Sequence, residues 1–69
     1  MPATFDQLLL TFNFLQTHAM ATSTPFTMTL NNRRLEVLPI GFYLYDDDNT
    51  RINKKPASAE LAARLFETL

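Results

Sequence analysis

The chain has 69 residues, of which 46% are hydrophobic and 19% charged, and its formal net charge is -1. This composition can form a small packed core, so we expect a single domain over residues 1–69. The absence of cysteine excludes a disulfide scaffold, and the near-neutral charge argues against binding driven by bulk positive charge. Domains of this size usually gain stability from disulfides, a metal or association, and association is the route left open.

The first predicted element is a helix from Phe5 to Ala19. Thr4 and Gln7 have the spacing of a capping box, in which each side chain satisfies the other residue's backbone N–H. No apolar run approaches the ~20 residues of a membrane span. Leu8-Leu9-Leu10 is too short for a signal peptide and follows no basic residue, so we expect a cytoplasmic protein with no membrane partner.

Two faces of this helix are apolar. A stripe with i, i+3, i+4 spacing is expected to cover the core, and it comprises Phe5, Leu8, Leu9, Phe12, Leu15 and Ala19. Leu10 and Phe14 project from the opposite side, in a region where Asp6 is the only charged residue before Arg33. We interpret Leu10 and Phe14 as an interface residue pair. The alternative is that the sheet and the second helix enclose the first helix within one monomer.

Two alternating runs follow, Phe26–Leu30 and Arg33–Val37, separated by Asn31-Asn32, and the strands are predicted over Phe26–Leu30 and Arg34–Leu38. A two-residue turn there pairs Met28 with Leu35 and Phe26 with Val37, which places the large apolar side chains on one face. A slip of one residue would turn the whole set outward, so the register is strongly specified.

The remaining elements are a third strand and a second helix. Pro39-Ile40-Gly41 predicts a turn, residues 42–45 a strand, and Asp46–Asn49 a solvated turn, with Arg51-Ile52 as a candidate short fourth strand. Ser58 or a neighbour caps the last helix, whose predicted apolar stripe is Leu61, Ala62, Leu65, Phe66 and Leu69. The fold class is therefore α+β: a three-stranded antiparallel meander in the order α-β-β-β-α, with two helices on one face.

The inventory for catalysis and metal binding is thin. Asp46 and Asp48 stand where an EF-hand loop has its first two ligands, but Arg51 replaces the required glycine and Ala57 the required glutamate. His18 has no second ligand spaced to help it. With no cysteine nucleophile and one glycine, we expect no catalytic residues, no metal and no cofactor, and therefore not an enzyme.

A basic group offers the alternative function of nucleic-acid binding. Its members are possible anion contacts, and they are Arg33, Arg34, Arg51, Lys54 and Lys55. The element order, with Lys54-Lys55 and Ala57 opening the last helix, resembles a double-stranded-RNA-binding domain over about a dozen C-terminal residues. The chain departs from that family at Ser58, where a further lysine is expected, and in the short Asn31-Asn32 turn, so the resemblance implies shared topology only.

Tyrosines on the outer sheet face offer a second route to nucleic acid, because exposed rings such as Tyr43 and Tyr45 can stack on bases. Cross-strand pairing is the commoner role of such residues. We therefore expect a non-enzymatic protein-interaction module, either a homodimer or a small regulator that docks on a larger protein, with nucleic-acid binding as the alternative.

Overall fold

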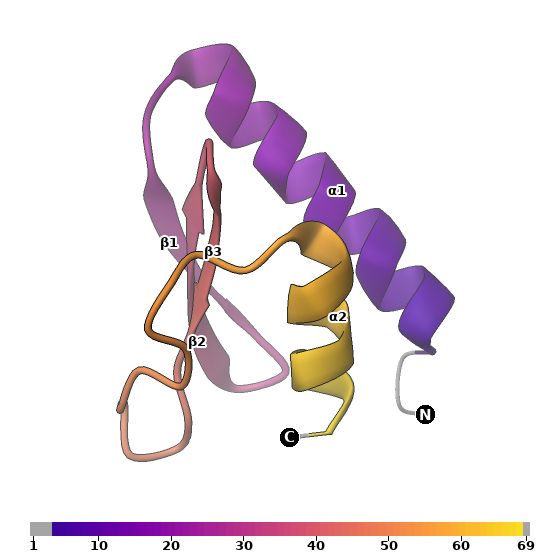
Figure 1. Cartoon of the computed structure of the whole chain (residues 1–69), viewed down its shortest axis with the longest axis vertical. Coiled ribbons are helices and arrows are strands. Elements are labelled where there is room, and N and C mark those ends of the chain that lie inside the picture. Colours follow the sequence, from indigo (N-terminus) through magenta and orange to yellow (C-terminus); the bar gives the residue numbers. More distant parts are fainter. Residues whose placement is uncertain (1–3, 69) are drawn as a thin grey trace.

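The computed structural model describes residues 4–68, which form two helices and a three-stranded antiparallel sheet in the expected order (Figure 1). Helix α1 spans Phe5–Thr22 and begins with the predicted capping box. The Thr4 N–H donates to Gln7 Oε1 at 3.0 Å, and the Gln7 N–H donates to Thr4 Oγ1 at 3.2 Å.

Helix α1 continues three residues beyond the predicted end at Ala19. It stops where Ser23 adopts a left-handed conformation, with φ of 55°, and donates its N–H to the carbonyls of Ala19 and Met20. No proline or glycine lies within this stretch to break the helix, because Pro25 comes only after the cap.

The sheet has the predicted register. Strands β1 (Phe26–Leu30) and β2 (Arg33–Leu38) pair Met28 with Leu35 and Phe26 with Val37, and β3 (Gly41–Leu44) lies on the other side of β2. Asn31 and Asn32 have φ of 52° and 65°, the positive values that a primed two-residue turn requires. Strands β2 and β3 each begin one residue earlier than predicted.

Both helices cover one face of the sheet, α1 mainly over β2 and α2 over β3 (Figure 1). The centre of the core is the ring of Phe12, whose centroid lies 5.0 Å from that of Phe42 and 5.7 Å from that of Phe66 in edge-on contacts. The inward residues of β2 and β3 are fully buried, whereas Phe26, Met28 and Leu30 of β1 are only half-buried.

Helix α2 spans Ala59–Glu67, is capped by the Ser58 side chain and packs a stripe that agrees with the predicted one at Ala62, Leu65 and Phe66 but differs elsewhere. Its buried residues are Ala59, Ala62, Ala63 and Phe66, and Leu65 is half-buried. Leu61 is 49% exposed, so its assignment to the core was wrong. At ~100° per residue Leu61 points away from Ala59 and Phe66, and the small alanines let the helix approach the sheet. Leu69 lies outside the described residues.

The expected fourth strand is reduced to a single bridge between Tyr45 and Arg51. Beyond it, the side chain of Asn53 takes the place of backbone partners for β3. Its Oδ1 accepts the N–H of Leu44 at 2.9 Å, and its Nδ2 donates to the carbonyls of Phe42 at 2.9 Å and Lys55 at 2.7 Å. A second bridge, between Phe42 and Ala57, completes the cover on this edge of the sheet.

Candidate functional site

The exposed side of α1 carries the largest apolar side chains of this helix that do not enter the core. Leu10 is 73% exposed and Phe14 is 72% exposed. The alternative of a helix enclosed on both sides within the monomer is therefore wrong, because α2 packs against the other side of α1, over Phe12. We call the surface centred on Leu10 and Phe14 the α1 outer face.

Polar residues on the α1 outer face are largely satisfied by the helix itself. The hydroxyl of Thr11 donates to the carbonyl of Gln7 at 2.9 Å, and that of Thr17 donates to the carbonyl of Asn13 at 2.8 Å. Such bonds to residue i−4 use the hydroxyl proton and leave the threonine methyl exposed. Asp6, in the first turn, is the only Asp, Glu, Lys or Arg of α1. The α1 outer face thus carries an apolar pair among uncharged polar residues, and beyond that first turn it has no charge.

Two further exposed apolar residues were not predicted. Met20 is 58% exposed near the end of α1, and Ile40 is 75% exposed in the β2–β3 turn. The turn is held to α1 because Gln16 Nε2 donates to the carbonyl of Pro39 at 3.2 Å. Met20 was missed because the predicted helix ended at Ala19, one residue before it.

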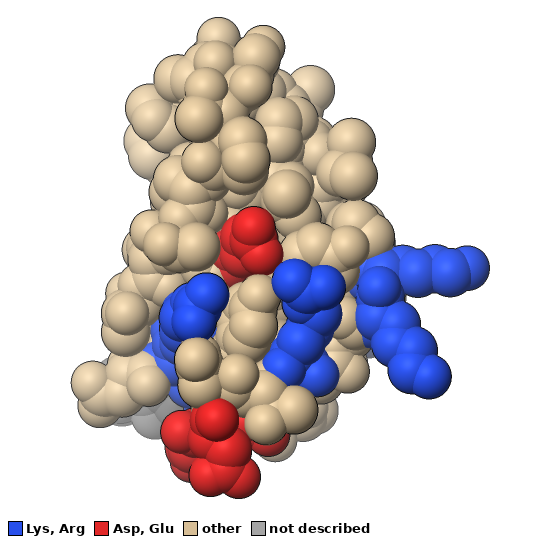
Figure 2. Space-filling view, turned by 90° about the vertical axis from the view of Figure 1, so that its left-hand side faces the viewer, with Lys and Arg blue, Asp and Glu red and all other residues tan. Residues whose placement is uncertain are grey.

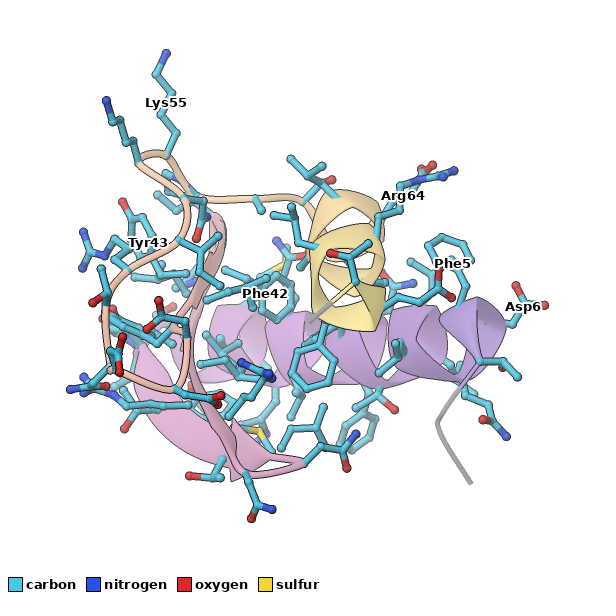
Figure 3. All side chains as sticks on the ribbon, turned by 90° about the horizontal axis from the view of Figure 1, so that it is seen from below. Phe5, Asp6, Phe42, Tyr43, Lys55 and Arg64 are labelled. Carbon is cyan, nitrogen blue, oxygen red and sulfur yellow. The ribbon has the colours of Figure 1, made fainter. Side chains whose placement is uncertain are left out.

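The five basic residues do not form a purely basic patch, because acidic side chains lie among them (Figure 2). On the open sheet face, Lys, Arg, Asp and Glu side chains gather toward one end and leave the other end without charge (Figure 2). Arg33 pairs with Asp47 at 3.2 Å, and Arg34 donates to Asn49 Oδ1 at 3.0 Å. Lys55 extends away from the body of the protein (Figure 3). Lys54 and Lys55 are exposed and precede Ala59, so they do not open the last helix as the resemblance to the RNA-binding family required.

Arg51 belongs to a cluster with both tyrosines of the open sheet face. Its guanidinium Cζ lies 3.9 Å from the ring centroid of Tyr43, and it donates to the Tyr45 hydroxyl at 3.3 Å. That hydrogen bond is the largest of the effects that raise the pKa of Arg51 above its ordinary value, and attraction to Glu36, 3.8 Å away, adds to it. These contacts favour the charged form of Arg51.

The tyrosines have little ring surface left for stacking on bases. Arg51 covers Tyr43, and Tyr45 is only 8% exposed, with the Arg34 guanidinium 4.6 Å from its ring centroid. On the same face the register places Thr27 opposite Glu36 and Thr29 opposite Arg34. The open sheet face is thus stabilised by contacts among its own residues.

The acidic turn binds its own backbone. Asp46 Oδ1 accepts the N–H groups of Asp48 and Thr50 at 2.9 and 3.0 Å. Among residues 4–68, no group of three or more His, Cys, Asp or Glu side chains is arranged to hold a metal ion. His18 is exposed and its ring packs edge-on against Phe26 at 5.6 Å. Sequence patterns do not report such a contact between distant residues.

The chain matches no protein-family model, no curated protein and no solved structure. Within the described part of the chain, neither helix has the length and apolar character needed to cross a membrane.

Proposed function

We propose that this protein is a non-enzymatic interaction module of the cytoplasm that docks on another protein through the α1 outer face. One observation carries the proposal: Leu10 and Phe14, one helical turn apart, are more than 70% exposed on a helix face whose only charged residue is Asp6 in the first turn. Scattered exposed apolar residues are ordinary, whereas adjacent ones at i, i+4 are the anchors with which a helix fills a partner's groove.

The energy available from this surface is large enough to matter. Burying both side chains fully would contribute ~3–6 kcal/mol before the costs of association. Two kinds of partner fit the proposal, a second copy of the chain and a larger protein with an apolar groove, for which this chain would be a small regulator or inhibitor.

Charge supports protein docking over the nucleic-acid alternative. Three of the five basic residues, Arg33, Arg34 and Arg51, contact acidic, amide or aromatic side chains of the same chain. Lys54 and Lys55 remain as exposed side chains, and that of Lys55 extends away from the body of the protein (Figure 3), which is a small footprint for phosphate contacts.

The test replaces the apolar pair without weakening the helix. In the variant Leu10→Glu with Phe14→Lys, the new charges stand in the favourable i, i+4 order and leave the net charge unchanged. The matched control is Ile40→Lys with Leu61→Glu, which removes two exposed apolar residues from other surfaces. Each protein is used as bait in an extract of the producing cells at low and at high salt, and its own oligomeric state is measured by sedimentation.

We expect the wild type and the control to retain the same stoichiometric partner at both salt concentrations. The α1 variant should lose this partner although its unfolding temperature equals that of the wild type. An apolar interface survives added salt, whereas phosphate binding weakens steeply. The same partner retained by the α1 variant would overturn the proposal, as would a partner released by salt.

A further inference from the structure

The two edges of the sheet differ, and the difference concerns β1. The β3 edge is covered by residues 51–57 and by the side chain of Asn53. Among residues 4–68, β1 pairs only with β2, so its other side is an open edge. Proteins normally protect such an edge with a charged residue, an internal proline or a bulge. Strand β1 reads Phe-Thr-Met-Thr-Leu and contains none of these.

The ladder shows which backbone groups this edge presents. The Tyr45 N–H donates to the carbonyl of Arg34, so the backbone of Arg34 faces β3. Thr29, which lies opposite Arg34, therefore forms no backbone hydrogen bond with β2, and its N–H and C=O groups point away from that strand. Because bonded and non-bonded pairs alternate in an antiparallel ladder, the same holds for Thr27. The N–H and C=O groups of Thr27 and Thr29 are the donors and acceptors on the open edge.

From this edge we infer that the protein pairs with a second copy of itself, β1 against β1 and antiparallel, about a two-fold axis at Met28. In this register Thr27 of one copy exchanges both backbone hydrogen bonds with Thr29 of the other, and the pair repeats by symmetry. A register shifted by two residues either way must use Pro25, which has no N–H, or Asn31, whose φ of 52° is not extended. Only the register centred on Met28 uses every available group.

The side chains of β1 suit the same arrangement because the strand is symmetric about Met28. Phe26 lies opposite Leu30 of the second copy, and Met28 lies opposite Met28 of the second copy. On the sheet face that the helices leave open, threonines lie opposite threonines. The inward residues Phe26, Met28 and Leu30, half-buried in the monomer, gain apolar neighbours across the axis. The strand has no charged side chain, so bringing two copies together creates no repulsion.

The helices leave room for this dimer. They lie over β2 and β3 (Figure 1), and in the combined sheet the two β2 strands are three strand spacings apart, or ~14 Å. Two packed helices need only ~8–10 Å between their axes. The inference goes beyond the proposed docking of the α1 outer face and does not depend on it. A small interface of this kind forms a weak dimer, so its detection requires a concentration series.

The first experiment removes a hydrogen bond on the open edge. Thr29→Pro deletes an N–H that faces away from β2, and Thr29→Val keeps it with a side chain of similar shape. Sedimentation across a concentration series is expected to show a monomer–dimer equilibrium for wild type and Thr29→Val. For Thr29→Pro the dissociation constant should rise ~10- to 100-fold, because one bond is lost from each copy. Circular dichroism checks that both variants retain the fold.

The second experiment tests the register with single cysteines, which is straightforward because the chain has no cysteine. Residues facing each other at Met28 have Cα atoms ~4.5 Å apart, within disulfide range. Thr27 and its copy are offset by two residues, ~7 Å along the strand alone, beyond that range. Under mild oxidation Met28→Cys should therefore form covalent dimers at least ~10-fold faster than Thr27→Cys or the exposed control Ile40→Cys.

Three results would overturn the inference. They are a wild type that is monomeric at every concentration, a dimer insensitive to Thr29→Pro, and equal crosslinking by the three cysteine variants. A dimer that is lost in Leu10→Glu with Phe14→Lys but kept in Thr29→Pro would assign self-association to the α1 outer face. That result would support the proposed function and refute β1 pairing.

Discussion

Asn32 closes the β1–β2 turn in a conformation that most residues avoid, with φ of 65°. Asparagine tolerates this region because its side chain is short and polar, glycine adopts it without strain, and a β-branched residue is a genuine outlier there. The two asparagines therefore help to fix the register that places the apolar residues of β1 and β2 on one face.

We expect Asn32→Gly to change the free energy of unfolding by less than ~0.5 kcal/mol, and Asn32→Val to lower it by ~1–2 kcal/mol because of the left-handed backbone. Denaturant unfolding of both variants beside the wild type measures the difference. A harmless valine would contradict the turn geometry and the register that depends on it.

Gly41, the first residue of β3, is required for two reasons. Its φ is 155°, and a Cβ built there would lie 2.7 Å from the carbonyl oxygen of Ala57 and 2.9 Å from Cβ of Pro56. Both neighbours belong to the segment that crosses the start of β3, and the contact with a backbone oxygen has no flexible side chain to relieve it.

We therefore expect Gly41→Ala to lower the free energy of unfolding by ~2–3 kcal/mol through strain and a broken Phe42–Ala57 bridge. The measurement is the denaturant midpoint at unchanged slope. Ala21→Gly, an exposed helical site, serves as a control expected to cost at most ~1 kcal/mol. A Gly41→Ala variant as stable as the wild type would contradict the close approach of residues 56–57.

At the scale of elements, the segment between β3 and α2 is held by backbone hydrogen bonds to β3 and by one amide side chain. Asn53 forms three hydrogen bonds, to Leu44, Phe42 and Lys55, and it is half-buried. An amide group can do this because it donates and accepts at once, as a peptide group does.

Replacing Asn53 by alanine should lower the free energy of unfolding by ~2–4 kcal/mol, at ~1 kcal/mol for each lost bond and more for any group left buried. Asn53→Asp keeps the acceptor for the Leu44 N–H but cannot donate, so it should also destabilise. Hydrogen exchange of the Leu44 amide reports the local effect. Asn13→Ala, on exposed helix, is the control, and equal stability of the Asn13 and Asn53 variants would contradict this role.

Local rules predicted much of each element. The capping box at Thr4 and the two-residue turn at Asn31-Asn32 are sequence patterns of neighbouring residues, and both are confirmed. The role of Asn53 depends on where the chain crosses β3, which no neighbouring residue specifies. Leu61 was misassigned because the apolar residues of α2 cover a wider part of the helix surface than the sheet and α1 bury. Their spacing alone does not indicate which of them face the core.

At the scale of the whole molecule, the candidate surfaces were predictable only in part. The exposure of Leu10 and Phe14 agrees with the interface interpretation, in which one apolar face of the helix covers the sheet and the opposite face stays outside the core. The contacts of the basic residues were not predictable, because the pairing of Arg33 with Asp47 and of Arg51 with Tyr43 depends on how a turn and a strand meet in space. Charge counts along a sequence cannot separate a binding patch from such internal pairs.

The exposure of Lys54 and Lys55 leads to a prediction for these lysines. We expect Lys54→Ala with Lys55→Ala to leave partner binding and stability unchanged, because both side chains are exposed and belong to neither α1 nor β1. The nucleic-acid alternative predicts instead that this variant loses binding uniformly across sequences and that its salt slope falls by ~2. Retention of duplex and single-stranded probes over a salt series decides between them, with Leu61→Gln as the control.

The difference between the two sheet edges also determines how far assembly can proceed. A subunit with two open edges is bivalent and can add neighbours without limit, which is how strands propagate into fibres. Because residues 51–57, including the Asn53 side chain, occupy the β3 edge, each subunit has one edge through which it can extend the sheet. Strand pairing through β1 therefore ends at two copies. By bonding the backbone of β3, the amide of Asn53 prevents a further copy from adding at that edge.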